Sequence, residues 1–212
     1  MANSITPYDV VLARMGRIDS LVPHVLPEVL PCPRSKAVDA LRAVAVEFCG
    51  TSEVWRVSIS DTVYEGEKVV DLGLEHGVDV VRVKSVTLGN KVLRANEYAV
   101  MDTSVYFANA VNKDTEATID AVLRPARGFG NRGGDILPYD ILDRYGDVLV
   151  YGALAKLKSM SGQNVAWSDA SGASFALSLY NEGSARARIE ALRRQHGTAT
   201  FGNTLFVNGL GG

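Results

Sequence analysis

The chain has 212 residues, of which 47% are hydrophobic and 22% are charged, a composition typical of a globular protein. With 22 lysines and arginines against 24 aspartates and glutamates, the formal net charge is −2. This balance argues against a dedicated DNA-binding protein, because phosphate contacts require a basic excess. No run approaches the roughly 20 apolar residues of a membrane-spanning helix, and residues 1–5 do not resemble the start of a secretory signal.

The chain has two cysteines, Cys32 and Cys49. Two cysteines without a secretory signal indicate a reducing compartment. Two buried free thiols are therefore the favoured interpretation, and a disulfide between Cys32 and Cys49 is the alternative.

The first quarter of the chain is predicted to be helical after an N-terminal arm. Residues 1–17 show no clear periodicity and are interpreted as the arm. Apolar residues then recur at helical spacing at Ile18, Leu21, Val22 and Val25. Prolines at 27, 31 and 33 interrupt that segment. A longer helix is expected over Lys36–Phe48, with Gly50 as its stop signal.

From Val54 to Arg124 the hydrophobic period changes from helical to alternating. Gly89 and Asn90 indicate a short hairpin turn. No helix-length segment separates the strands, so an antiparallel sheet or a small barrel is expected. The strands are predicted at Trp55–Ile59, Lys68–Leu72, Val78–Leu88, Tyr98–Met101, Val105–Ala108 and Ala117–Leu123.

The last third is predicted to hold two helices and an apolar tail. A helix is expected over Leu137–Met160, where Gly152 would allow close packing of a neighbouring helix. A final helix is expected over Ser168–Arg194. Its apolar residues at helical spacing are Phe175, Leu179, Ala185, Ile189 and Leu192. The tail, residues 198–212, has no charged side chain and is too short to form its own core.

Together these patterns predict an α+β fold, in which a helical bundle of three to four helices carries an inserted antiparallel β unit. The bundle is expected to be discontinuous in sequence. The predicted division is an arm at 1–17, the bundle at 18–53 and 136–196, the β insertion at 54–127, a glycine-rich connector at 128–135 and a docking tail at 197–212.

Residues 128–133 satisfy the spacing G-x-G-x-x-G, which occurs in dinucleotide-binding sites. Such a site also requires a parallel βαβ unit, whereas two predicted helices follow here. The motif is therefore interpreted as a flexible hinge, and no cofactor is expected. The three histidines, His24, His76 and His196, lie in separate segments without partners at ligand spacing, so no metal site is expected.

The sequence indicates no catalytic residues. It lacks G-x-S-x-G, and the carboxylate pairs Asp140/Asp143 and Glu65/Glu67 match solvated helix faces and loops. A glycosidase pair from distant parts of the chain stays open. The arginines near the end of the last helix, including Arg186 and Arg188, fit contact with an acidic partner or with phosphates, and equally a favourable interaction with the helix dipole.

Three segments resemble bacteriophage head–tail adaptors, also called connector or tail tubular protein A-like proteins. The first is Leu21–Trp55, with its Leu-Pro-Glu-Val and Cys-Pro entry and its Glu-Phe-Cys and Val-Trp exit. The others are Asp143–Leu157 and Trp167–Arg188. They cover about half of the chain in the family's order. The glycine-rich connector and the long apolar tail depart from the family pattern.

The resemblance implies a structural protein rather than an enzyme, assembled as a closed, dodecameric ring beneath the portal. Its expected partners are the portal protein, a tail or nozzle protein and further copies of itself, with genomic DNA passing through the lumen. The expected location is the virion, at the head–tail interface, and the host cytoplasm during assembly, without membrane contact. The residues predicted to dock are Phe201, Leu205, Phe206, Val207, Arg186 and Arg188.

Two alternatives to the adaptor stay open. One is a tail-associated cell-wall hydrolase, which a close, buried carboxylate pair in a cleft would favour. The other is a different virion ring protein, such as a tail-completion or stopper subunit.

Overall fold

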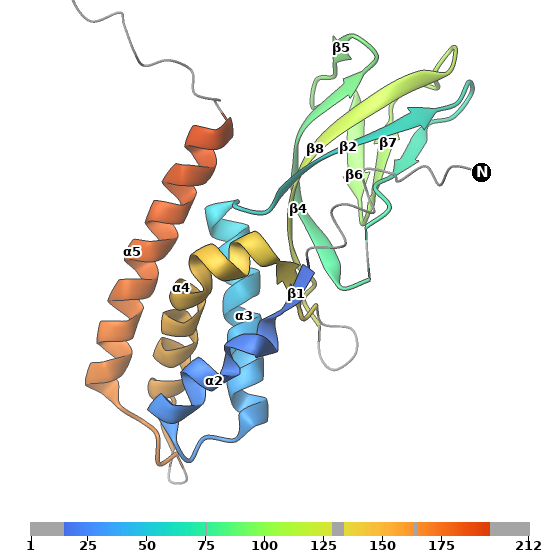
Figure 1. Cartoon of the computed structure of the whole chain (residues 1–212). Coiled ribbons are helices and arrows are strands. Elements are labelled where there is room, and N and C mark those ends of the chain that lie inside the picture. The colour runs from blue at the N-terminus through green and yellow to red at the C-terminus, as the bar shows by residue number, and fades with distance from the viewer. Residues whose placement is uncertain (1–14, 75, 129–133, 163–164, 196–212) are drawn as a thin grey trace, which may run out of the picture.

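The computed structural model describes residues 15–74, 76–128, 134–162 and 165–195. The helices gather in one part of the molecule and most of the strands in another (Figure 1). Within the described residues, no helix is both long enough and apolar enough to cross a membrane.

Three long helices build most of the helical part. They are α3 (Arg34–Ser52), α4 (Tyr139–Lys158) and α5 (Ala170–Gln195), and they pack against one another. Three short segments precede them, η1 (Ile18–Leu21), α2 (Val22–Val25) and η2 (Leu26–Val29). Each of the three predicted long helices is therefore present, with boundaries shifted by a few residues.

The helix α3 extends past its predicted stop. Gly50 lies inside the helix, and the C-cap is Glu53, which adopts a left-handed φ of 56°. The buried face of α3 carries Ala37, Leu41, Val44, Ala45 and Phe48. Cys32 and Cys49 are both free and buried, as predicted, and burial raises the pKa of the Cys49 thiol.

A two-stranded sheet joins the beginning of the described chain to the start of α4. It pairs β1 (Met15–Arg17) with β9 (Ile136–Pro138) in antiparallel register, so that Gly16 lies opposite Leu137. Both strands have only three residues, which is too short for a periodic sequence signal. The predicted arm therefore contains a strand at its end, and the predicted α4 begins two residues later than expected.

The remaining strands form two antiparallel sheets. The larger sheet has the order β2-β8-β4-β5 and the smaller one the order β3-β7-β6. The strands of the larger sheet are β2 (Arg56–Val63), β4 (Val78–Leu88), β5 (Lys91–Val92) and β8 (Thr115–Pro125). Those of the smaller sheet are β3 (Val69–Asp71), β6 (Tyr98–Met101) and β7 (Ser104–Phe107). The predicted hairpin turn is present between β4 and β5, where Gly89 has a positive φ.

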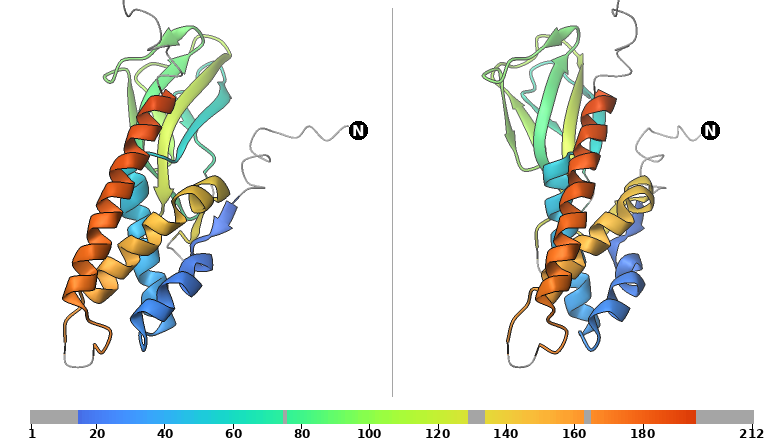
Figure 2. Two further views of the ribbon diagram at one scale, coloured as in Figure 1. Left: turned by 60° about the vertical axis from the view of Figure 1, so that its left-hand side comes forward. Right: turned by 90° about the vertical axis from the view of Figure 1, so that its left-hand side faces the viewer.

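Two hydrophobic cores support this arrangement. One lies between the two sheets and includes Ile59 and Ile119 from the larger sheet and Val70, Val105 and Phe107 from the smaller. The other lies among the helices, and the ends of β4 and β8 nearest the helices also enter it through Val78, Ala121 and Leu123. The long strands β4 and β8 therefore connect the two cores (Figures 1 and 2).

The predicted fold class is wrong. The structure is a mixed fold with four α-helices and nine strands in three antiparallel sheets among the described residues, and its β-rich domain is not a small insertion in a helical bundle. The strands bury a core of their own between two sheets, whereas a small insertion would depend on the helices for burial. Alternation located individual strands, but it does not reveal how many sheets they form.

Candidate interaction surface on the last helix

The inner face of α5 is made of small residues and one tyrosine. Its buried members are Ala173, Ala176, Tyr180, Gly183, Ala187 and Ala191. A Cβ atom added at Gly183 would lie 2.5 Å from Cγ2 of Val148 on α4. The backbones of α4 and α5 therefore approach closely, and α5 fits its groove with little side-chain bulk.

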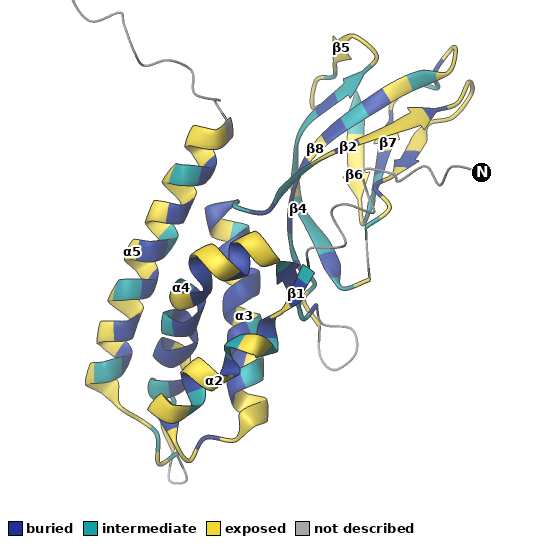
Figure 3. Cartoon of the chain, in the orientation of Figure 1, coloured by how far each residue is buried: buried dark blue, intermediate teal, exposed yellow. Residues whose placement is uncertain are grey.

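The outer face of α5 carries the large apolar side chains. Six exposed residues of this face form what we call the outer stripe: Phe175, Ser178, Glu182, Ala185, Ile189 and Leu192. They are spaced alternately by three and four residues, which places them along one side of the helix. Phe175 is 67% exposed, Ile189 50% and Leu192 39%. Most of the apolar repeat that predicted this helix therefore faces solvent in the single chain (Figure 3).

Arginines border the outer stripe on both sides. Arg186 and Arg193 directly follow stripe residues and lie on one side, while Arg188 directly precedes Ile189 and lies on the other. All three are exposed. Arg186 forms an ion pair with Glu182 at 3.3 Å, and Arg188 forms no ion pair with any described residue. Of the predicted docking residues, Arg186 and Arg188 therefore lie beside one exposed apolar surface, whereas Phe201, Leu205, Phe206 and Val207 lie outside the described residues.

The helix is fixed to α4 by a polar contact beside the stripe. The hydroxyl of Tyr145 donates a hydrogen bond to the carboxylate of Glu190 at 2.8 Å, and Arg144 lies 3.9 Å from the same carboxylate. Burial, together with this bond to a carboxylate, raises the pKa of Tyr145 to about 12. The contact holds the C-terminal half of α5 in a defined orientation.

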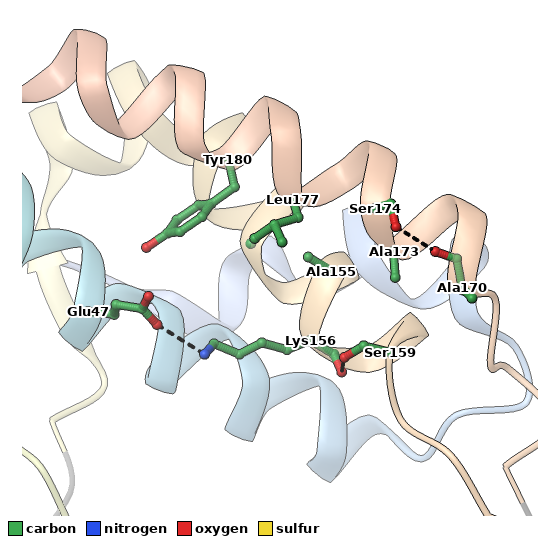
Figure 4. A pocket seen from close by; sticks show the side chains of 10 residues that line it. Glu47, Ala155, Lys156, Ser159, Ala170, Ala173, Ser174, Leu177 and Tyr180 are labelled. Atoms are coloured by element: carbon green, nitrogen blue, oxygen red, sulfur yellow. Dashed lines mark hydrogen bonds and ion pairs between the residues drawn. The ribbon is translucent and has the colours of Figure 1, made fainter.

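A hollow of about 360 Å³ lies on one flank of α5, between this helix, α3 and α4 (Figure 4). Ala155, Ala173 and the half-exposed Leu177 line it, and Tyr180 closes its inner end. An ion pair between Lys156 and Glu47, at 3.0 Å, borders it. The hollow is mainly apolar and adds to the uncovered apolar surface along this helix.

A second exposed apolar surface lies on the smaller sheet and was not predicted. Four outward-facing residues form what we call the sheet patch: Val69, Ala99, Met101 and Tyr106. Tyr106 pairs with Val69 on one side and with Ala99 on the other, and Met101 lies two residues from Ala99 on the same face. Val69 is 42%, Tyr106 39% and Met101 55% exposed.

Acidic side chains border the sheet patch. Asp71 lies two residues after Val69 on β3 and therefore shares its face, and Glu67 lies two residues before it. Both are exposed, and neither forms an ion pair with a described residue. Asp71 accepts a hydrogen bond from the backbone N–H of Gly73, and Glu67 from that of Tyr64.

Among the described residues, Glu53 at the end of α3 has a buried carboxylate. Its oxygens lie 3.1 Å from Arg56 and Arg82 and 2.6 Å from Lys84. Burial alone would raise the pKa of Glu53, but the hydrogen bond from Lys84 and the three positive charges outweigh it, and the pKa is lowered. The cluster joins the last turn of α3 to β2 and β4, which is a structural role.

The other candidate sites do not come together in the structure. His24 lies on α2 and His76 before β4, both exposed, and no group of three potential metal ligands occurs among the described residues. The pairs Asp140/Asp143 and Glu65/Glu67 are exposed, as expected for solvated carboxylates. Most of the glycine motif, residues 129–133, and His196 lie outside the described part, while Gly134 of the connector is buried and donates a hydrogen bond to the carbonyl of Ala126.

Comparison with known proteins gives no further assignment. No protein-family model matches the sequence, and no curated protein shows a significant match.

Proposed function

We propose that this protein is a structural subunit of a bacteriophage head–tail adaptor, which assembles as a ring beneath the portal. The observation that carries the proposal is the outer stripe of α5. Apart from Tyr180, this helix buries small residues, and it exposes the large apolar side chains of Phe175, Ile189 and Leu192. Exposed apolar surface such as the end of the stripe with Ala185, Ile189 and Leu192 is typical of protein–protein contact sites.

A ring requires each subunit to present two different, complementary surfaces, since its contacts are head-to-tail. This chain has two exposed apolar surfaces of opposite border charge, one on α5 and one on the smaller sheet. The resemblance of three segments to head–tail adaptors favours a ring between the portal protein above and a tail or nozzle protein below. With a net charge of −2, the chain has no basic excess that would hold the DNA passing through the lumen.

The proposal is tested by mixing the purified full chain with tailless, portal-bearing heads and imaging them by electron microscopy. The expected result is a ring of added density at the portal vertex and at no other vertex. Heads that bind no protein at saturating concentrations would overturn the adaptor role. A ring that forms in solution but does not bind heads would favour a different virion ring protein.

A further inference from the structure

We propose that the outer stripe of α5 docks onto the sheet patch of a second copy of this chain. The inference rests on the proposed function and deepens it, because it names the two surfaces that form the contact between subunits.

The two surfaces lie on opposite parts of the molecule. In Figure 1, α5 forms one edge, while β6 and β7 lie beyond the larger sheet on the other side. When the molecule is turned by 90°, α5 faces the viewer and the strands lie behind it (Figure 2, right). A helix on one side and a patch on the other cannot meet within one chain, but they can meet between successive copies, and repetition of that contact gives a ring or a filament.

The borders of the two surfaces carry opposite charges. The outer stripe is flanked by Arg186, Arg188 and Arg193, and the sheet patch by Glu67 and Asp71. Arg188, Glu67 and Asp71 form no ion pair with a described residue in the single chain. Charges that border an apolar contact fix its orientation and exclude wrong partners.

The same arginines disfavour the simplest alternative, in which two α5 helices pair with each other. In a paired helix the residues beside the stripe face their counterparts on the other chain, whether the helices run parallel or antiparallel. In a parallel pair Arg188 would face Arg193 of the other chain and repel it, whereas Arg186 is already paired with Glu182. The stripe therefore fits an acidic surface better than a second stripe.

The position of Asp71 also agrees. Asp71 ends β3, and Glu67 lies before this strand in a turn, where its N–H donates to the carbonyl of Tyr64. An α-helix with its side chains is about 10–12 Å across. A helix that crosses the strands over Val69 and Tyr106 therefore covers the patch with Asp71 beside it on the same face.

The test uses two charge-reversed variants of the full chain. In the helix variant Arg188→Glu is combined with Arg193→Glu, and in the sheet variant Glu67→Lys with Asp71→Lys. Each variant alone should lose self-association by at least about tenfold in dissociation constant, measured by analytical ultracentrifugation. A mixture of the two variants should associate again, because each contact then joins opposite charges.

The matched control combines Arg34→Glu with Lys36→Glu, which changes the net charge as much as the helix variant does, at exposed positions of α3. It should associate like the unchanged protein. Circular dichroism melting checks that each variant is folded. An Ile189→Lys variant, which places a charge at the centre of the apolar half of the stripe, should also lose association.

Each outcome decides the inference. If the unchanged protein forms a ring that both variants still form, the contact surfaces are wrong, but the adaptor role stands. If the contact behaves as expected and the rings do not bind portal-bearing heads, the inference stands and the adaptor role fails. If deletion of residues 198–212 lowers the mass of the assembly and neither charge-reversed variant does, the outer stripe and the sheet patch do not bind a second copy. An unchanged protein that stays monomeric, alone and on heads, overturns the inference.

Discussion

Glu53 connects the two parts of the molecule through one carboxylate. It ends α3 in a left-handed conformation and is 7% exposed, with three cations from β2 and β4 around it. Because the pKa of Glu53 is lowered in the folded state, its ion pairs stabilise the protein above the ordinary pKa of a glutamate. That stabilisation is lost as the pH falls through the folded-state pKa.

We therefore expect Glu53→Gln to lower the free energy of unfolding at pH 7 by about 1–3 kcal/mol, since three cations would lose their counter-charge. The difference from the unchanged protein should shrink as the pH falls below the folded-state pKa of Glu53. Urea denaturation at several pH values measures both effects. A difference that is constant down to acid pH would show that the charge of Glu53 is not what stabilises the junction.

Two glycines in helices provide a matched pair of substitutions. In α4, a Cβ atom at Gly152 would lie 2.6 Å from Cγ1 of Val44 and 2.8 Å from Cδ2 of Tyr180, whereas one at Gly50 in α3 meets nothing within 4 Å. Gly152→Ala should therefore destabilise by about 1–3 kcal/mol through overpacking. Gly50→Ala should stabilise by about 0.5–1 kcal/mol, because alanine is the better helix former. Thermal melting of both variants is the measurement, and equal shifts would contradict the close packing of α3, α4 and α5.

At the scale of elements, α5 shows what a sequence pattern can and cannot predict. Its existence was predicted from apolar residues at helical spacing, and the helix is present. The pattern did not reveal that Phe175, Ile189 and Leu192 face outward, because the buried face, apart from Tyr180, consists of alanines and a glycine, which contribute little to a hydrophobic repeat. The sequence therefore predicted the helix from these residues, but it did not predict that they are exposed.

The two faces of α5 should respond differently to the same new side chain. Ile189→Lys should change the free energy of unfolding of the monomer by less than about 0.5 kcal/mol, because Ile189 is half exposed. Ala187→Lys should lower the free energy of unfolding by at least about 3 kcal/mol or prevent folding. Ala187 is fully buried on the side of α5 that faces α4, where a charged side chain has no room. Chemical denaturation at low protein concentration makes the comparison, and similar losses in both variants would show that the assigned faces are wrong.

The C-terminal tail stays a sequence-based prediction, since residues 196–212 lie outside the described part. Removal of residues 198–212 should leave the melting temperature of the monomer nearly unchanged and should abolish attachment to portal-bearing heads. The reason is that ordering such a segment costs roughly 1–2 kcal/mol per residue, which a large partner surface can offset. Truncated protein that unfolds would place the tail in the core, and truncated protein that still binds heads would remove its docking role.

At the scale of the whole molecule, the sequence predicted most elements and not their assembly. The alternation from Val54 to Arg124 located the strands, and both ends of that region were correct to within a few residues. The second core between two sheets depends on pairings between distant strands, such as β3 with β7, that leave no local signal. The sheet patch could not be predicted for the same reason, because Val69, Tyr106 and Ala99 become neighbours only after those strands pair.

The central claim is that copies of this chain assemble into a closed ring that binds a portal. The most direct test is the mass of the full chain, alone and with purified portal protein, by native mass spectrometry. A closed ring on the portal gives one discrete complex with a fixed number of 22.8 kDa chains per portal assembly, and a contact that weakens at high salt. A mass of one chain at every concentration, together with an unchanged mass of the portal, would contradict it.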